Sequence, residues 1–238
     1  MNKKTLDVIL ICGVNYGGKS TLSSALVKAY PEIVTESISA TTRQPRQKTD
    51  FAEAEIDGTH YYFVKENVFE EQDFIEYEKF VDEKGNPTYY GTPTSELIRA
   101  YTENKILAIV LEAKGMNNVY RNIHSFEYEG QTIELRKTAV LLNITKKNVY
   151  KRLNEQVDRE KFPEIYEKEV GRIERGNIPK LIKELGIEQY ADVKRDRYFK
   201  EGYVKDIVNA VPRLLCCENS KKKGLNQNLG EKSNFHNY

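Results

Sequence analysis

A segment near the N-terminus combines glycines, a lysine and a serine in a spacing that suits phosphate binding. Residues 13–20 read Gly-Val-Asn-Tyr-Gly-Gly-Lys-Ser and fit the pattern G-x-x-x-x-G-K-S/T. Glycines let the backbone curl so that several N–H groups point at one phosphate, and a following helix N-terminus adds a positive dipole. Lys19 would bridge the outer phosphates and the Ser20 hydroxyl would ligate magnesium. The segment indicates a nucleoside triphosphate site. A GTPase is the alternative, but the later sequence lacks the N-K-x-D motif that usually reads guanine in that class.

A second group of candidate anion ligands follows in residues 37–46, which read Ser-Ile-Ser-Ala-Thr-Thr-Arg-Gln-Pro-Arg. Arg43 and Arg46 are three residues apart around a proline, so both guanidinium groups can converge on one anion from an extended loop. On charge alone, two loop arginines are more often simply solvated. The spacing by itself leaves both interpretations open.

Three short apolar runs are typical of buried parallel strands, and each is followed by a helical pattern. The runs cover residues 6–12, 105–111 and 138–144, and the helical patterns cover 20–30, 113–121 and 147–157. Alternation of strand and helix predicts an α/β fold with a three-layer, mainly parallel sheet core. The motif at residues 13–20 makes this core P-loop NTPase-like. The phosphate-binding segment then joins the first strand to the first helix.

The remaining segments predict additions to this core within one domain over residues 1–217. Residues 36–104 have short alternating strands, many tyrosines and turn signals, which indicate a small inserted α+β lobe. Residues 147–176 carry dense charge on helical patterns and suit a helical lid. The core then comprises 1–35, 105–146 and 177–217, with a last helix at about 203–217. Residues 218–238 have little to bury, so we expect a disordered tail.

Four motifs occur in an order that resembles guanylate kinases, which are P-loop nucleoside monophosphate kinases. After the phosphate-binding segment, residues 37–46 are similar to SVSATTRxPR, and 57–64 contain a run similar to DYxFV. Residues 74–77 read FIEY, and 89–93 read YYGTP. The resemblance covers roughly residues 6–215. It implies ATP as phosphoryl donor, Mg²⁺ as cofactor and a nucleoside monophosphate, GMP or dGMP, as acceptor.

The resemblance also implies roles for individual residues. ATP would be bound by Gly13, Asn15, Tyr16, Gly17, Gly18, Lys19, Ser20 and Thr21. The acceptor would be bound by Ser39, Arg43, Arg46, Tyr61, Glu76, Tyr90, Gly91, Thr92 and Glu112. Lys19 and Arg43 would act in catalysis with Arg152 and Arg172 from the lid, where Arg175 also lies. Ser20 would ligate magnesium, and Glu112 would hold it through a water molecule.

Glu76 suits guanine on chemical grounds. A carboxylate that accepts two parallel hydrogen bonds matches the N1–H and N2–H₂ donors that lie side by side on guanine. Adenine has an acceptor at N1 and would leave the carboxylate unsatisfied, at a cost of about 1–3 kcal/mol or more. The preference for guanine depends on Glu76 facing the base, and an outward-facing residue on an edge strand is the alternative.

Several positions depart from the family pattern. Guanylate kinases usually carry D-x-D followed by two residues and glycine, whereas Val110 and Glu112 occupy the two acidic positions here. Gln156 falls where the lid often has an arginine, and His60 replaces an aspartate. These departures keep two alternatives open, a related kinase with another nucleotide or phosphorylated-sugar acceptor and a non-catalytic binding module.

The composition of the chain limits which classes of binding partner are expected. The chain has 37 basic and 36 acidic residues in 238, so no net field favours nucleic acid or a membrane surface. The N-terminal apolar run is too short to span a bilayer, and we expect a soluble cytoplasmic protein. Cys12, Cys216 and Cys217 fit neither a disulfide framework nor a zinc spacing, so we expect reduced thiols. A monomer and a homodimer remain equally open.

Overall fold

A computed structural model describes residues 4–48, 53–81, 84–142 and 144–175, together with Lys180, Lys183 and Ala191–Asp192. The helix expected at 203–217 and the tail expected at 218–238 lie outside the described residues. Within the described ranges, none of the helices combines the length and the apolar character that crossing a bilayer requires.

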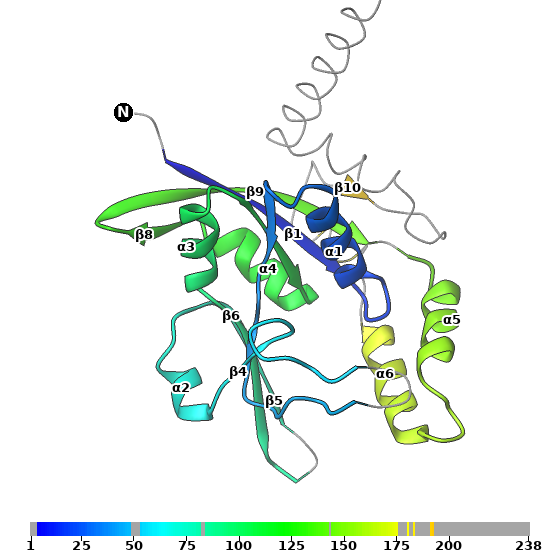
Figure 1. The fold of residues 1–238 in the computed structure, drawn as a ribbon. Coiled ribbons are helices and arrows are strands. Elements are labelled where there is room, and N and C mark those ends of the chain that lie inside the picture. Colours follow the sequence, from blue (N-terminus) through cyan, green and yellow to red (C-terminus); the bar gives the residue numbers. More distant parts are fainter. Residues whose placement is uncertain are drawn as a thin grey trace, which may run out of the picture.

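The core is a parallel sheet whose strands follow the order β10-β9-β1-β7-β2 (Figure 1). The strands are β1 (Thr5–Gly13), β2 (Val34–Glu36), β7 (Ile106–Leu111), β9 (Gln131–Leu142) and β10 (Ala191–Asp192). Every pair along this order is parallel, with β1 in the centre between β7 and β9. The α/β class with a mainly parallel sheet, expected from the apolar runs, is confirmed.

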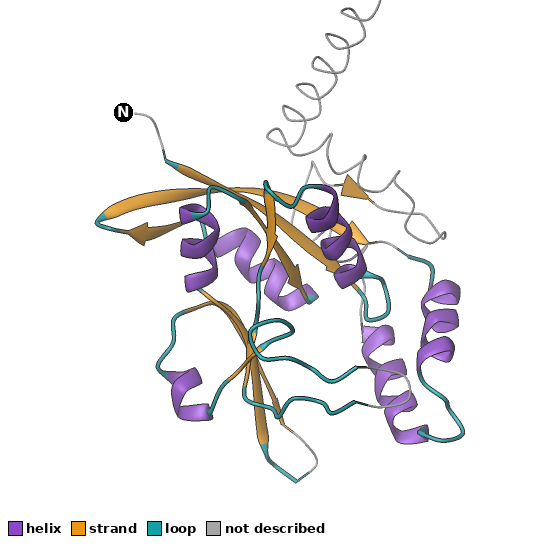
Figure 2. Ribbon diagram, viewed as in Figure 1, coloured by secondary structure: helices purple, strands orange, loops and turns teal. Residues whose placement is uncertain are grey.

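Helices cover both faces of this sheet, which explains why the central strand is apolar on both sides (Figure 2). Leu10 and its neighbours on one face of β1 pack in a cluster with α3 (Ser95–Thr102) and α4 (Ala113–Asn122). Ile9 and Ile11 on the other face pack against α1 (Lys19–Ala29). Each fully buried aliphatic side chain contributes about 1.5–3 kcal/mol relative to exposure. The three-layer core follows from this burial on both faces.

The strand β9 begins seven residues before the start predicted at 138. It forms an antiparallel hairpin with β8 (Ser125–Tyr128), and the turn residues Glu129 and Gly130 both have positive φ. Positive φ at both central residues is typical of a two-residue hairpin turn. The prediction missed this part of β9 because residues 131–137 mix polar and apolar side chains, and their pairing with β8 and β1 is a tertiary effect.

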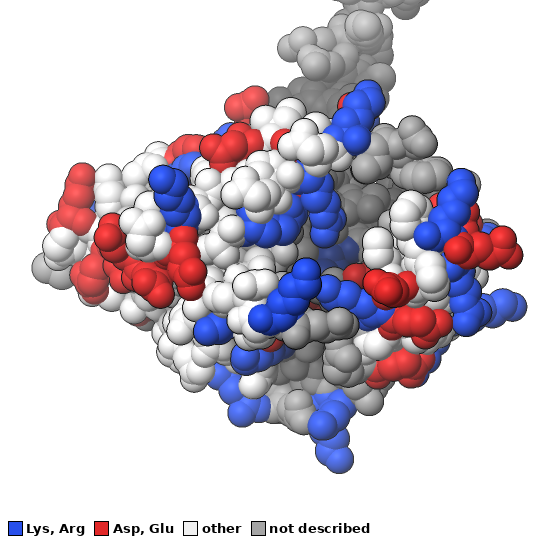
Figure 3. Space-filling view, turned by 90° about the horizontal axis from the view of Figure 1, so that it is seen from below, with Lys and Arg blue, Asp and Glu red and all other residues white. Residues whose placement is uncertain are grey.

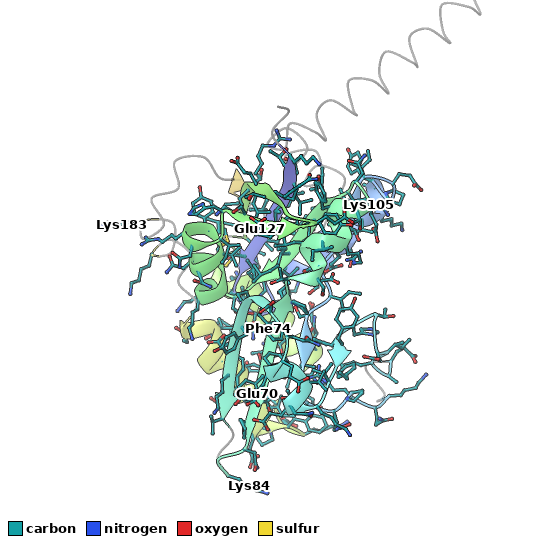
Figure 4. The ribbon with its side chains drawn as sticks, turned by 90° about the vertical axis from the view of Figure 1, so that its left-hand side faces the viewer. Glu70, Phe74, Lys84, Lys105, Glu127 and Lys183 are labelled. Atoms are coloured by element: carbon teal, nitrogen blue, oxygen red, sulfur yellow. The ribbon has the colours of Figure 1, made fainter. Side chains whose placement is uncertain are left out.

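A second sheet, with order β4-β3-β6-β5, forms the lobe that projects from the core (Figure 1). Its elements are β3 (Ala40–Thr41), β4 (Tyr62–Phe63), β5 (Phe74–Val81), β6 (Pro87–Pro93) and the short helix α2 (Glu66–Glu70). Figure 4 shows Phe74 at the end of the lobe next to the core and Lys84 at the far tip. The next helix, α3, packs on the core through Leu97 and Ala100.

Two helices, α5 (Lys146–Gln156) and α6 (Pro163–Arg175), lie beside the core and form the helical pair expected for a lid (Figure 1). Their contact is a small cluster of buried side chains, Val149, Leu153, Tyr166 and Ile173. Val14 and Tyr16 of the phosphate-binding segment pack against the same cluster. The helical pair is therefore joined to the core at that segment.

One half-buried lysine closes the C-terminal end of α4. The Lys137 ammonium, on β9, donates to the carbonyls of Val119 at 3.1 Å, Tyr120 at 2.5 Å and Ile123 at 2.8 Å. The last carbonyls of a helix have no partner within the helix, and a basic side chain both satisfies them and complements the helix dipole. Burial lowers the pKa of Lys137.

Replacing Lys137 with alanine should therefore destabilise the fold. Lys137→Ala leaves the carbonyls partly unsatisfied, and we expect the free energy of unfolding to fall by about 1–3 kcal/mol. Urea denaturation measures the change. Lys151→Ala is the control, because that side chain is exposed and its ion pair with Glu155 is 4.0 Å long. Equal effects of the two substitutions would contradict the capping role.

Candidate active site

The phosphate-binding segment runs from the last residue of β1 into the first turn of α1. The Gly17 N–H donates to the Val14 carbonyl at 2.9 Å, and a Cβ at position 17 would lie 2.7 Å from that oxygen. Gly18 precedes α1 with φ of 91°, in the left-handed region. The backbone thus requires both glycines, of which Gly18 belongs to the motif and Gly17 occupies one of its unspecified positions. The hydroxyl-bearing residues Ser20 and Thr21 are exposed at the start of α1.

Lys19 is held between the loop and the residue that precedes α4. Its ammonium donates to the Gly13 carbonyl at 2.9 Å and to the Glu112 carboxylate at 3.0 Å. The Lys19 side chain is 11% exposed, whereas that of Glu112 is 55% exposed. Burial raises the pKa of the adjacent Cys12 to about 12, so this thiol stays protonated. The arrangement places a largely enclosed cation and an exposed carboxylate at the carboxyl ends of β1 and β7.

In the lobe, the side chain of Arg43 is enclosed by aromatic rings and a carboxylate. Its guanidinium donates two hydrogen bonds to Glu55, at 2.5 and 2.7 Å, and lies 5.0 Å from the Tyr61 ring centroid. The Tyr90 ring lies edge-on to Tyr61, with 6.0 Å between centroids. The backbone N–H of Arg46 also donates to Glu55, at 2.7 Å, while the Arg46 side chain is exposed. The structure thus brings Arg43, Tyr61 and Tyr90 together, with Arg46 at the rim.

Glu55 was not singled out from the sequence, although it lies between the two arginines and Tyr61. The one available signal is its acidic character in a loop next to Arg46. Its carboxylate takes a position on Arg43 suited to any anion, because two parallel hydrogen bonds from a guanidinium fit a carboxylate and a phosphate alike. Arg43 lowers the pKa of Glu55 to about 2, and the same pairing raises the pKa of Arg43.

Glu76 and Thr92 face each other across β5 and β6. The Thr92 hydroxyl donates to the Glu76 carboxylate at 2.9 Å, and Thr92 is fully buried. Burial raises the pKa of Glu76. The outward orientation kept open for Glu76 is therefore not the one found. Gly91 has a packing role beside them, because a Cβ there would lie 2.7 Å from Phe74. Ser39 is half-buried just before β3.

The first turn of α4 contacts both groups of side chains. Glu112, immediately before the helix, pairs with Lys19, and three residues later a Cβ at Gly115 would lie 3.0 Å from the Glu76 carboxylate. Residues three apart on a helix are neighbours on one face. The phosphate-binding segment and the pair in the lobe therefore approach each other across one helical turn. Basic side chains gather in the middle of the face in Figure 3, with acidic ones on two flanks.

Val110 does not take part in this group. It is partly buried and packs with the apolar cluster between the sheet and α1. The position therefore supplies neither a carboxylate nor a hydrogen bond acceptor from its side chain. Of the two departures at the end of β7, Glu112 faces the candidate site and Val110 serves packing.

The helices α5 and α6 contact the phosphate-binding segment directly. The Arg152 guanidinium donates to the Tyr16 carbonyl at 3.1 Å, and the Asn15 amide donates to Glu169 of α6 at 3.1 Å. Tyr16 has φ of 60°, which is unusual for a residue other than glycine. Arg172 lies on α6, but its side chain is outside the described part of the structure, as is that of Arg175. Glu169 was missed in the sequence, where it appears as one charge among many.

The Arg43–Glu55 pair should make stability depend on pH in the acidic range. The folded pKa of Glu55 is about 2, against an ordinary value of 4.5. A lowered carboxyl pKa contributes stability above pH 4.5 that is lost as the pH falls towards 2. Compared with Glu55→Gln, the wild type should be more stable by about 2–3 kcal/mol at pH 6, and by less than half of that at about pH 3. Chemical denaturation at both pH values measures this, and a difference independent of pH would contradict it.

Comparison with known proteins identifies a family for the chain. The model of the guanylate kinase family matches residues 5–173. The guanylate kinase of Synechococcus elongatus is 35% identical over 122 residues, which cover 50% of this chain and 60% of that protein. The guanylate kinase of Mycoplasmopsis synoviae is 36% identical over 117 residues, covering 48% of this chain and 54% of that protein. The chain thus spans 60% or less of the length of these curated relatives.

The crystal structure of guanylate kinase from Anaplasma phagocytophilum is similar with a TM-score of 0.48 and 14% identity, covering 91% of this chain and 87% of that one. The family match is the stronger finding, because it runs from β1 through the phosphate-binding segment and the lobe into α6. The chain belongs to the guanylate kinase family.

Proposed function

We propose that this protein transfers the terminal phosphoryl group of ATP to a nucleoside monophosphate, with GMP or dGMP as acceptor. The observation that carries the proposal is the double contact of the first turn of α4, where Glu112 pairs with Lys19 and Gly115 abuts Glu76. Phosphoryl transfer consists mainly of positioning two phosphates in line and neutralising charge, so adjacent donor and acceptor sites are its first requirement.

On the donor side, the backbone N–H groups of residues 13–20 and the N-terminus of α1 would bind the phosphates of ATP. Lys19 would exchange the Glu112 carboxylate for phosphate oxygens, because both are anionic acceptors within reach of a partly enclosed ammonium. The attacking atom is an oxygen of the acceptor's phosphate, so the reaction needs no nucleophile from the protein. Arg152 and Arg172 would add positive charge from the lid.

The donor set suits magnesium as it is bound in phosphoryl-transfer enzymes. Ser20 offers an exposed hydroxyl, and Glu112 offers an exposed carboxylate next to Lys19. The described residues contain no cluster of three His, Cys, Asp or Glu side chains that would hold a metal alone. Mg²⁺ typically keeps several waters and uses one or two protein ligands plus substrate phosphates. Bound there, it would neutralise charge on the donor phosphates, with Ser20 as direct ligand and Glu112 through water.

On the acceptor side, Arg43, Arg46, Tyr61 and Tyr90 would bind the monophosphate. Arg43 is already held in place by Glu55 and by the ring of Tyr61. A phosphate dianion would compete with Glu55 for the same donors and carry more charge than the carboxylate. The base would meet Glu76, Thr92 and Ser39, and guanine supplies the two donors that the Glu76 carboxylate accepts.

One observation favours a variant of this function with another acceptor. Val110 packs in the apolar core, so the carboxylate that the family usually carries at that position is absent from this edge of the site. A kinase of a different nucleoside monophosphate is therefore the second candidate. A binding module without turnover is the outcome that the following experiment would expose.

The first test is turnover. ADP release should be measured with ATP, Mg²⁺ and each nucleoside monophosphate in turn. We expect GMP and dGMP to be the best acceptors and Lys19→Ala to lower kcat by about 100-fold or more, because the substitution removes positive charge at the transferred group. Lys151→Ala, far along α5, is the control with unchanged rate. Absence of turnover with every monophosphate would refute the proposed kinase activity.

A second test concerns the base. Glu76→Gln replaces one acceptor oxygen by a donor. We expect the ratio of kcat/KM for GMP to that for AMP to fall by a factor equivalent to about 1–3 kcal/mol. Steady-state kinetics with both acceptors measure it. Glu70→Gln, an exposed carboxylate elsewhere in the lobe, is the matched control. Unchanged discrimination in Glu76→Gln would show that another residue reads the base.

A further inference from the structure

The helix α3 carries a carboxylate that is buried yet has no role in the site described above. Glu96 is 2% exposed and lies in the first turn of α3. It accepts hydrogen bonds from the backbone N–H of Ile38 at 2.9 Å, from the Tyr62 hydroxyl at 3.1 Å and from Arg99 at 2.7 Å. A buried carboxylate needs such partners, because an unpaired charge in the interior is strongly destabilising.

The donors to Glu96 come from different parts of the molecule. Arg99 also donates to the Thr35 hydroxyl and to the Glu36 carbonyl, both at 2.8 Å, and these residues belong to β2 of the core sheet. Ile38 lies between β2 and β3, and Tyr62 lies on β4 of the lobe. The Glu96–Arg99 pair therefore touches the core strand, the connecting segment and the lobe sheet at one point.

The backbone shows that this point is the passage from core to lobe. The Ser37 N–H still donates to Ala108 of the core strand β7 at 2.9 Å. The next N–H, of Ile38, donates to Glu96 instead. The Ser39 carbonyl then accepts from the Tyr62 N–H of the lobe at 2.9 Å. Over three consecutive residues the chain changes its partner from the core sheet to α3 and then to the lobe sheet.

Glu96 itself is fixed to the core. The neighbouring Leu97 and Ala100 are buried in the cluster that α3 shares with β1 and β7. Glu96 is also placed favourably at the N-terminus of α3, where the helix dipole stabilises negative charge. Burial and the charge of Glu96 raise the pKa of Tyr62, so the hydroxyl keeps its proton and remains a donor.

We infer that Glu96 is a positioning residue, which sets the orientation of the lobe relative to the core through Ile38 and Tyr62. The residues next to these two contacts are Ser39 and Tyr61, which are assigned above to the base and to the phosphate of the acceptor. The inference rests on the proposed function, because positioning matters for a reaction between a core site and a lobe site. The Glu96 carboxylate is buried while Arg99 is half-buried, and in some proteins such polar groups specify one arrangement more than they stabilise it, which fits this role.

The principal variant is Tyr62→Phe, which removes the hydroxyl that links the lobe sheet to Glu96 and keeps the ring. We expect the KM for GMP to rise about 3- to 10-fold, because a smaller fraction of the protein holds the lobe in the binding orientation. The KM for ATP should stay within about twofold, because the donor loop makes no contact with Glu96 in the described structure. Glu96→Gln should shift the KM for GMP in the same direction and further.

Glu103→Gln is the matched control. Glu103 also pairs with Arg99, at 3.5 Å on the same helix, but it is more exposed and is not a partner of Ile38 or Tyr62. It should leave both KM values unchanged. A thermal melt of each variant shows whether the fold is retained, and Tyr62→Phe carries the test if Glu96→Gln fails to fold.

Amide hydrogen exchange supplies a readout that does not depend on turnover. In Tyr62→Phe, exchange should accelerate in residues 37–41 and 60–64 and remain unchanged in β7. If the wild type phosphorylates no monophosphate, the proposed function fails, and local acceleration would still support the positioning role. Unchanged exchange together with an unchanged KM for GMP would overturn the inference. A parallel rise of both KM values with general loss of protection would also overturn it, because it would indicate ordinary destabilisation.

Discussion

The first turn of α4 is the contact on which the arrangement of the candidate site depends. It lies at the carboxyl end of β7, so the central sheet fixes its position, and it presents Glu112 to Lys19 and Gly115 to Glu76. A larger side chain at position 115 would push Glu76 away from the helix, and a different residue at 112 would leave the enclosed ammonium of Lys19 with backbone carbonyls alone. The core and the lobe thus approach each other closely at this turn.

Carboxylates pair with two cationic side chains of the candidate site. Glu112 lies on Lys19, and Glu55 lies on Arg43. Such pairs keep flexible cationic side chains ordered, which reduces the entropy lost when a phosphate binds. These pairs would also disfavour the binding of singly charged anions, because such an anion gains little free energy by displacing a carboxylate. The same contacts thus favour phosphates over less charged ligands.

The sequence predicts those features that depend on local pattern. The apolar runs locate β1 and β7, and the glycine spacing locates the phosphate-binding segment, because both reflect short-range requirements of backbone and burial. The predicted start of β9 was wrong, because the first residues of β9 become a strand only by pairing with β8 and β1. Glu55 and Glu96 were missed for the same reason. Arg43 lies 12 residues before Glu55 and Ile38 lies 58 residues before Glu96, and nothing in the local pattern reports such pairing. The role of Arg172 stays a prediction.

The left-handed backbone of Tyr16 has an energetic consequence for the helices α5 and α6. A residue with a side chain occupies this conformation at a cost of about 1–2 kcal/mol, whereas its ring gains contact with the apolar cluster of α5 and α6. Withdrawal of the two helices would return the ring to water without relieving the backbone. The docked arrangement is thus the one in which the unfavourable torsion is compensated, and any outward swing of the helical pair has to work against that hydrophobic anchor.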